Sequence, residues 1–331
     1  MKTLWIAALC AAGLSHVPTL HAQANTQATQ VVWKIATGYR AESFHTENLL
    51  QFGRDVEAST KSQLHIEVAP NGSLFKLNDI RQAVQDGKVG AGETIMTSMV
   101  KDIPVAGADS IPFVVGSYKR AQRLWQFQRP GIEREFAQRG MKILYAVPWP
   151  PQGLYTTRPV STLNDFKNTK MRTYNQTTVR IAEMLGATPV DVAMADVGTA
   201  VSSGRMDTMI TSAVTGVENK VWGPIKFYYE INAWYPKNIV FVSSKSFGAL
   251  SPDNRAAVLK AAADAESRGW TTSEAIAQTS TKELQANGIK VERISTDLET
   301  DFKRLGERFS REWVRSVGHQ ASDIFVPYYF N

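Results

Sequence analysis

Arg172 is the charged side chain of this sequence best placed to do chemistry on a small anion. It ends the short run Lys170-Met171-Arg172 and is followed by Thr173-Tyr174-Asn175. A guanidinium presents a planar set of donors that matches a carboxylate through two parallel hydrogen bonds. Spacing alone leaves a second interpretation open, in which Arg172 pairs with a nearby acid such as Asp165.

Aromatic side chains gather at similar positions in the sequence. Trp149 lies between two prolines, Tyr174 follows Arg172 by two residues, and Trp234 and Tyr235 form a pair. Each of these residues alone is more often a packing residue than part of a ligand wall. Together, near the ends of predicted strands, they indicate a pocket with apolar walls around one polar anchor.

Residues for metal binding or covalent catalysis are scarce in this sequence. Cys10 is the only cysteine, and the three histidines beyond residue 24 fit no metal-ligand spacing such as H-E-x-x-H. There is no G-x-S-x-G nucleophile motif and no Walker loop for phosphate. We therefore expect no cofactor, no metal site built by the protein and no catalytic residues, and leave open whether a metal accompanies a bound acid. The alternative is a secreted hydrolase or isomerase that uses Glu93 or Asp207 as its base.

Length and composition indicate a folded protein with one large domain or two medium ones. The chain has 331 residues, of which 43% are hydrophobic and 21% are charged, unlike the composition of disordered chains. Lys and Arg total 37 against 31 Asp and Glu, without a run of five like charges. This modest excess favours small anions as partners over nucleic acid.

The first 24 residues are predicted to be a cleaved secretory signal peptide. Lys2 precedes an apolar stretch over residues 4–14, and Ala22-Gln23-Ala24 supplies the small residues that a signal peptidase accepts, with cleavage after Ala22 or Ala24. The apolar stretch is far shorter than the roughly 20 residues needed to span a bilayer. We therefore expect an exported protein that is not embedded in the membrane.

Two stretches of the chain show the same order of predicted elements: strand, helix, strand, helix, strand. In the first stretch these elements cover residues 31–36, 46–60, 64–68, 77–86 and 89–94. In the second they cover residues 171–173, 178–185, 189–192, 195–203 and 206–211. Residues 79–89 also match residues 196–206 in sequence, at a constant offset of 117. Together these observations predict two related α/β halves.

Two such halves are expected to hold a ligand between them, because open parallel sheets bind ligands at the carboxyl ends of their strands. Glu93, at one such end, could accept a ligand hydroxyl or amine, or form a salt bridge across the cleft. A strand near residues 238–242 is expected to return the chain to the first half. Start and stop signals predict a helix over residues 252–287, long enough to cross both halves, with Gly269 as the point where it could bend.

Four stretches of the sequence carry a family likeness. They are residues 52–56 leading through 64–74; residues 110–113; residues 158–160 followed by 165–167 and 170–172; and residues 185–190. Over nearly all of its length beyond residue 24, the chain resembles the periplasmic solute receptors of tripartite ATP-independent (TRAP) transporters, the DctP-like family. The first and third stretches are specific when they occur in this order.

The resemblance implies an α/β protein with the two-lobed periplasmic-binding-protein fold. Each lobe would be a mostly parallel sheet flanked by helices, with the long C-terminal helix spanning both lobes. The expected limits are residues 31–150 with about 239–280 for lobe I, and residues 151–238 with about 281–331 for lobe II.

The resemblance also implies a periplasmic receptor that closes over an organic acid and delivers it to the membrane permease subunits of a TRAP transporter, driven by an ion gradient. A monomer is expected. In the family, the arginine that ends the K-x-R stretch clamps the ligand carboxylate, and Arg172 occupies that position here. A receptor for an ATP-driven importer is less favoured, because the K-x-R stretch matches the TRAP type.

Two departures from the family pattern bear on the ligand. Family members often have Gln-Glu-Asn-Pro where this chain has Met209-Ile210-Thr211-Ser212, so Thr211 replaces the asparagine, and a basic residue of some members lies near Gln152. With the aromatic residues, these departures favour a less polar monocarboxylate, aromatic and 2-oxo acids included. The candidate ligand-binding residues are Arg172, Thr211, Tyr174, Glu93, Trp149, Gln152, Asn175, Tyr39, Asn238 and Trp234.

Overall fold

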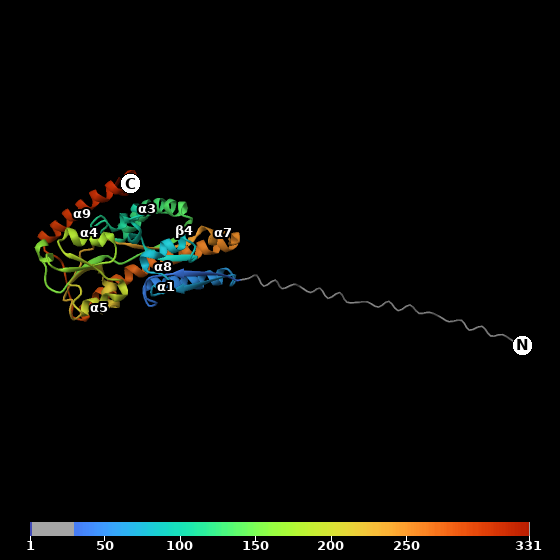
Figure 1. Cartoon of the computed structure of the whole chain (residues 1–331), viewed down its shortest axis with the longest axis horizontal. Helices are drawn as coiled ribbons and strands as arrows, with labels where there is room; N and C mark the ends of the chain where they lie inside the picture. Colours follow the sequence, from blue (N-terminus) through green and yellow to red (C-terminus); the bar gives the residue numbers. More distant parts are fainter. Residues whose placement is uncertain (2–29, 331) are drawn as a thin grey trace.

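Two β-sheets covered by helices make up the part of the chain that this computed structural model describes, which is residue 1 and residues 30–330 (Figure 1). The predicted signal peptide, with Cys10, lies outside the described residues apart from Met1. Sheet A contains, in order across the sheet, β2 (Leu64–Ala69), β1 (Val31–Ala36), β3 (Ala91–Ile95), β10 (Lys237–Ser243) and β4 (Met141–Pro148). Sheet B contains β11 (Lys290–Glu292), β9 (Phe227–Tyr229), β5 (Gln152–Thr156), β8 (Thr208–Ser212), β6 (Lys170–Thr173) and β7 (Thr188–Asp191).

The helices connect these strands and cover the sheets. They are α1 (Phe44–Ser59), α2 (Ile80–Gln85), α3 (Tyr118–Gln138), α4 (Gln176–Met184), α5 (Val197–Ser202), α6 (Ala213–Glu218), α7 (Ser244–Gly248), α8 (Pro252–Ala286), α9 (Thr296–Val317) and α10 (His319–Phe330). Short 3₁₀ turns occur at Leu77–Asp79, Met96–Met99, Pro104–Ser110, Leu163–Phe166 and Met194–Asp196. All five residues of β3 and of β8 are buried, as expected for strands covered on both faces.

In each sheet one strand runs against the others. In sheet A, β1 pairs in parallel with β2 and β3, whereas β10 is antiparallel to both β3 and β4. In sheet B the reversed strand is β5, which is antiparallel to β8 and β9. The chain crosses between the sheets from β4 to β5 and from β9 to β10. A chain that leaves one sheet at its carboxyl edge enters a facing sheet at that sheet's carboxyl edge. The entering strands, β5 and β10, must therefore run opposite to the other strands of their sheets. The prediction of two mostly parallel sheets is confirmed.

The predicted repeat is present at the level of individual elements. The turn at Leu77–Asp79, α2 and β3 recur as the turn at Met194–Asp196, α5 and β8, each 117 residues later. The two helices are followed by Gly87 and Gly204, with φ of 72° and 67°, a backbone conformation that glycine adopts without strain. The matched sequence therefore marks one strand-forming unit that each sheet uses once.

Helix α8 joins the two halves of the molecule, as predicted. The Ser251 hydroxyl accepts a hydrogen bond from the Asn254 N–H and caps its first turn. The helix packs on α1 and β4 beside sheet A and on α6 and β11 beside sheet B. It is continuous through Gly269, and the suggested bend there stays a prediction. This glycine permits close packing on β4, because a Cβ there would overlap a methyl group of Val147.

The C-terminal helices run from the sheet B half back to the sheet A half. The Ser295 hydroxyl, at the start of α9, donates to Ser161 O, between β5 and β6. At the other end, Arg123 of α3 donates to Tyr328 O of α10, and Figure 1 shows the C terminus beside α3. The segment of residues 281–331, predicted as part of lobe II, thus contacts both halves. The lobe limits remain a prediction.

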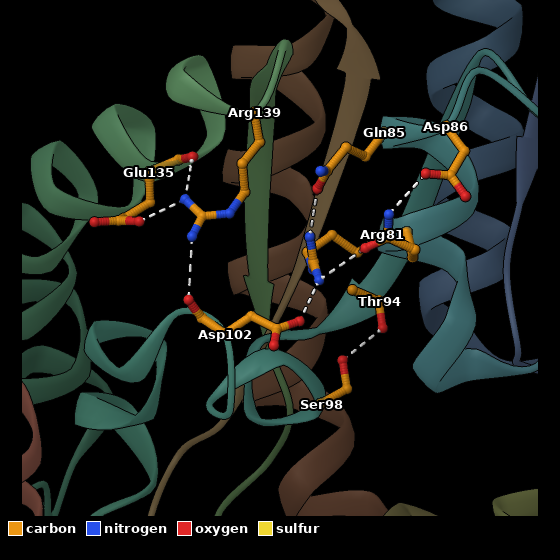
Figure 2. A network of polar contacts seen from close by, with 9 residues as sticks. Arg81, Gln85, Asp86, Thr94, Ser98, Asp102, Glu135 and Arg139 are labelled. Carbon is orange, nitrogen blue, oxygen red and sulfur yellow. Dashed lines mark hydrogen bonds and ion pairs between the residues drawn. The ribbon is translucent and has the colours of Figure 1, made fainter.

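Two arginines bind Asp102, which follows the 3₁₀ turn at Met96–Met99 (Figure 2). Arg81 of α2 donates to Gln85 Oε1 at 2.8 Å and to Asp102 Oδ2 at 2.5 Å. Arg139, just after α3, donates to Glu135 Oε2 at 2.6 Å and to Asp102 O at 3.2 Å. Asp102 therefore links the two helices through its side chain and its backbone carbonyl. A network of this kind holds a loop more firmly than isolated surface ion pairs do.

A buried ion pair anchors the chain where it re-enters sheet A. Lys237, the first residue of β10, is fully buried with Asp109 of the 3₁₀ turn at Pro104–Ser110. Asp109 Oδ2 accepts from the Lys237 backbone N–H at 2.8 Å and lies 3.4 Å from its Nζ. Burial raises the pKa of Asp109 and lowers the pKa of Lys237, whereas each opposite charge acts to restore the ionised form of its partner.

We predict that Lys237→Met lowers the free energy of unfolding by about 3–5 kcal/mol, because it leaves the Asp109 carboxylate buried without a counter-charge. The double variant Lys237→Met with Asp109→Asn should be less destabilised, since the amide oxygen can still accept from the backbone N–H. Urea unfolding measures both, with Lys245→Met, at an exposed lysine of α7, as the control. A double variant that is less stable than Lys237→Met would contradict this account.

Candidate functional site

A cavity of about 540 Å³ lies at the carboxyl ends of strands from both sheets. Six of the ten predicted binding residues line it: Tyr39, Trp149, Gln152, Arg172, Tyr174 and Thr211. They come from the loop after β1, the β4–β5 crossing, the start of β5, β6 and the loop after it, and β8. The cavity is therefore built by both halves of the molecule.

Several residues of the cavity wall were missed in the sequence, residues 76–78 among them. Two of the missed segments are the turn that contains Asn71 and Gly72, and residues 191–196. These two segments follow β2 and β7, which lie in the parallel parts of the two sheets. The rule that points to strand ends, applied to these two strands as well, would have found them.

Arg172 is a buried arginine that lines the cavity. The residue is 4% exposed, and its Nε donates to Val192 O at 3.0 Å. Its guanidinium lies over the Tyr174 ring, 4.7 Å from the ring centre. Among residues 30–330 no carboxylate is within ion-pair distance of it. Asp165, the alternative partner, instead accepts hydrogen bonds from the backbone N–H groups of Ser161 and Thr162.

The electrostatics of Arg172 favour a bound anion. Burial lowers its pKa to about 10, while Tyr174, Tyr39 and Asp191 act in the opposite direction. A buried charge without a counter-charge is costly. An anion in the cavity would supply that partner. Thr211 and Tyr174 line the same cavity, and a hydroxyl group can add a hydrogen bond to an anion.

Asn238 lies behind the cavity wall and holds two of the aromatic residues in place. Its Oδ1 accepts from the Tyr39 hydroxyl at 3.1 Å and from Trp149 Nε1 at 2.9 Å. Its Nδ2 donates to Glu93 Oε1 at 3.2 Å. Asn238 and Glu93, both predicted to contact the ligand, are absent from the cavity lining. They support residues that are part of it.

Glu93 is a buried carboxyl group without a cation beside it. Its Oε2 accepts from the Thr37 hydroxyl at 2.7 Å, and His45 Nδ1 lies 3.6 Å from its Oε1. Burial raises the pKa of Glu93 from 4.5 to about 7, against the effect of hydrogen bonds from Thr37 and Asn238. Burial also lowers the pKa of His45 well below its usual value, so this histidine is neutral beside it.

The remaining two predicted residues also lie outside the cavity lining. Asn175 caps α4 by accepting from the Thr178 N–H, and its Nδ2 donates to Thr97 Oγ1 at 2.6 Å. It therefore links the end of β6 to the turn after β3. Trp234 is 1% exposed and packs into the apolar core, where its carbonyl accepts from the Gln152 N–H.

Arg40 is a second link between the halves, and it was not predicted. It follows β1 of sheet A and donates to Ala195 O at 2.6 Å and Glu218 O at 3.0 Å, both on the sheet B side. It also donates to Asn219 Oδ1 at 3.3 Å. These bonds exist only while the two halves lie in this arrangement, so Arg40 stabilises it without lining the cavity.

Two further observations concern residues 30–330. No group of three or more His, Cys, Asp and Glu side chains in this range is arranged to hold a metal ion. No helix in the same range combines the length and the apolar character that crossing a bilayer requires.

A match to a family profile identifies the protein family of this chain. The profile of the bacterial extracellular solute-binding proteins, family 7, called DctP, matches residues 35–315. The chain belongs to this family. It is thus an extracytoplasmic solute receptor of the TRAP type and not an enzyme.

Solved structures and a curated relative agree with this assignment. DctP6 of Bordetella pertussis, an extracytoplasmic solute receptor binding pyroglutamic acid, matches with a TM-score of 0.88 and 35% identity over 90% of this chain and 99% of its own. A TRAP solute-binding protein from a marine metagenome, specific for pyroglutamate, matches with a TM-score of 0.88 and 33% identity over 91% and 99%. A solute-binding protein of Roseobacter denitrificans is 25% identical over 77% of this chain and 79% of its own.

We predict that Glu93 makes the stability of this receptor fall as the pH rises from about 4.5 to about 7. The folded state keeps the proton on Glu93 across this range, whereas the unfolded chain releases it, so the stabilisation present at low pH is lost on deprotonation. Glu93→Gln cannot ionise. Relative to the wild type, its free energy of unfolding should rise by roughly 3 kcal/mol between pH 4.5 and pH 8.

Urea unfolding over this pH range tests the prediction. Glu283→Gln, at an exposed position of α8, is the control and should follow the wild type. If Glu93→Gln and the wild type show parallel pH profiles, Glu93 does not titrate in this range.

Proposed function

We propose that this TRAP receptor captures a small monocarboxylate, with pyroglutamate as the first candidate, and delivers it to the membrane permease subunits of its transporter. The observation that carries the proposal is the buried Arg172 guanidinium, which lines the cavity without an ion-pair partner among residues 30–330. Two similar receptors with 35% and 33% identity bind pyroglutamate. Within the class of less polar acids, these relatives favour pyroglutamate over aromatic and 2-oxo acids.

The cavity offers complementary surfaces for such a ligand. The carboxylate would pair with Arg172, with Thr211 and Tyr174 as additional hydrogen-bond partners. The indole of Trp149 donates its only N–H to Asn238, so it offers carbon surface to the ring of the ligand. Charge pairing at one end and apolar contact at the other is the usual composition of a small-molecule site.

Ligand binding would also favour the closed arrangement of the halves. Arg172 and Thr211 come from sheet B and its loops, whereas Tyr39 follows β1 of sheet A. A ligand that contacts both sides binds the closed state better than an open one, and so shifts the population toward it. The permease would then recognise the closed receptor.

We predict that pyroglutamate raises the melting temperature of the receptor and binds in calorimetry as unchanged ligand, and that Arg172→Ala weakens binding at least about a hundredfold. Loss of the guanidinium leaves the carboxylate without its charge partner. Arg158→Ala, at an exposed arginine, is the matched control and should bind normally. Unchanged affinity in a folded Arg172→Ala variant would reject the proposed clamp. A panel with aromatic and 2-oxo acids tests the ligand class.

We predict that Arg40→Ala weakens pyroglutamate binding by about tenfold through the equilibrium between open and closed states, because a smaller closed population raises the apparent Kd. Arg40 does not line the cavity, so the contacts of the ligand are unchanged. Arg54→Ala is the control, since Arg54 bonds to Gln51 within its own helix. Small-angle X-ray scattering of the ligand-free proteins should show a larger radius of gyration for Arg40→Ala than for the wild type. Equal affinity in both variants would remove Arg40 from the closing mechanism.

A further inference from the structure

We infer that Tyr39 acts as a hydrogen-bond acceptor in the cavity, so that the receptor selects carboxylic acids that also carry an N–H or O–H donor. This inference rests on the proposed function and specifies which feature of the ligand, besides its carboxylate, is recognised. It follows from the hydrogen bonds that connect two residues of the cavity wall to the layer behind it. Asn238 accepts from Tyr39 and Trp149, which line the cavity, and donates to Glu93.

The orientation of the Asn238 amide is fixed by two neighbours with opposite requirements. Trp149 Nε1 carries a hydrogen and no available lone pair, so the Asn238 atom that lies 2.9 Å from it must be the oxygen. Glu93 Oε1, 3.2 Å from the other end of the amide, accepts a hydrogen bond and therefore faces the nitrogen. Both neighbours give the same orientation.

The amide orientation determines what Tyr39 can do. The Tyr39 hydroxyl lies 3.1 Å from the same Asn238 oxygen, which has no hydrogen to give. Tyr39 must therefore donate its single proton to Asn238, and only the lone pairs of its oxygen remain for a ligand. Glu93 and Asn238 are positioning residues in this arrangement.

Tyr39 and the proposed clamp, Arg172, line the same cavity. The Tyr39 ring also packs against Trp149, with 5.2 Å between ring centres. The cavity thus combines a cationic donor with a fixed neutral acceptor. A cyclic acid with an N–H next to the carbon that bears its carboxylate satisfies both.

The test compares two ligands that differ at one position of the ring. Pyroglutamate is a lactam, and 5-oxotetrahydrofuran-2-carboxylate is the lactone that replaces its N–H by an oxygen while keeping the carboxylate and the carbonyl. Calorimetry at pH 8 should show the lactone binding about tenfold to a hundredfold more weakly than pyroglutamate. The lactone gives the Tyr39 oxygen no hydrogen bond, and its ring oxygen places a lone pair against a lone pair of the Tyr39 oxygen. Equal affinities would overturn the inference and leave carboxylate capture standing. If neither pyroglutamate nor the lactone binds, both this inference and the proposed ligand are overturned.

Two tyrosine variants locate the discrimination. Tyr39→Phe should bring the affinities for lactam and lactone within about threefold of each other, because the acceptor is gone. Tyr174→Phe is the matched control: it removes another cavity hydroxyl that does not bond to Asn238, and it should keep the ratio of the two affinities. A Tyr39→Phe variant that retains the wild-type ratio would overturn the assignment to Tyr39. The wild-type comparison of the two ligands does not depend on the folding of either variant.

Discussion

The buried guanidinium of Arg172 is the constraint on which the rest of the site depends. A positive charge removed from water is tolerated only where a partner compensates for it, and the described part of the chain provides a carbonyl and an aromatic ring but no carboxylate within ion-pair distance. The fold therefore keeps one strong interaction available for a ligand. Burial also strengthens the attraction between this guanidinium and a bound carboxylate, because little water is left to screen the two charges.

The topology explains why this charge can face a second sheet. The crossings from β4 to β5 and from β9 to β10 enter the opposite sheet at its carboxyl edge, which reverses β5 and β10 and leaves the other strands pointing their carboxyl ends at the cavity. Helix α8 packs on both halves, and Arg40, in the loop after β1, bridges them. The ligand thus has to contribute only part of the energy that holds the halves together.

Much of this architecture was predictable from the sequence, because the match between residues 79–89 and 196–206 corresponds to one repeated turn, helix and strand. The rule of strand ends placed Arg172, Tyr174 and Thr211 at the cavity. It could not tell which side chains near a strand end face the cavity and which face the interior, since successive residues point to opposite sides. Glu93 and Asn238 lie on paired strands near those ends but point into the layer behind. Spacing alone does not fix that direction.

The layer of buried polar residues behind the cavity wall lowers the stability of the fold. Near Glu93, the buried His45 Nδ1 and Nε2 atoms and the Tyr145 hydroxyl have no hydrogen-bond partner among residues 30–330. An apolar layer of the same shape would stabilise the protein more. Such an apolar layer, however, would leave the Tyr39 hydroxyl free to rotate and to serve a ligand as donor or as acceptor. A polar layer that fixes the proton of Tyr39 trades stability for a defined pattern of donors and acceptors in the cavity, and local rules of stability are most often broken in this way beside a functional site.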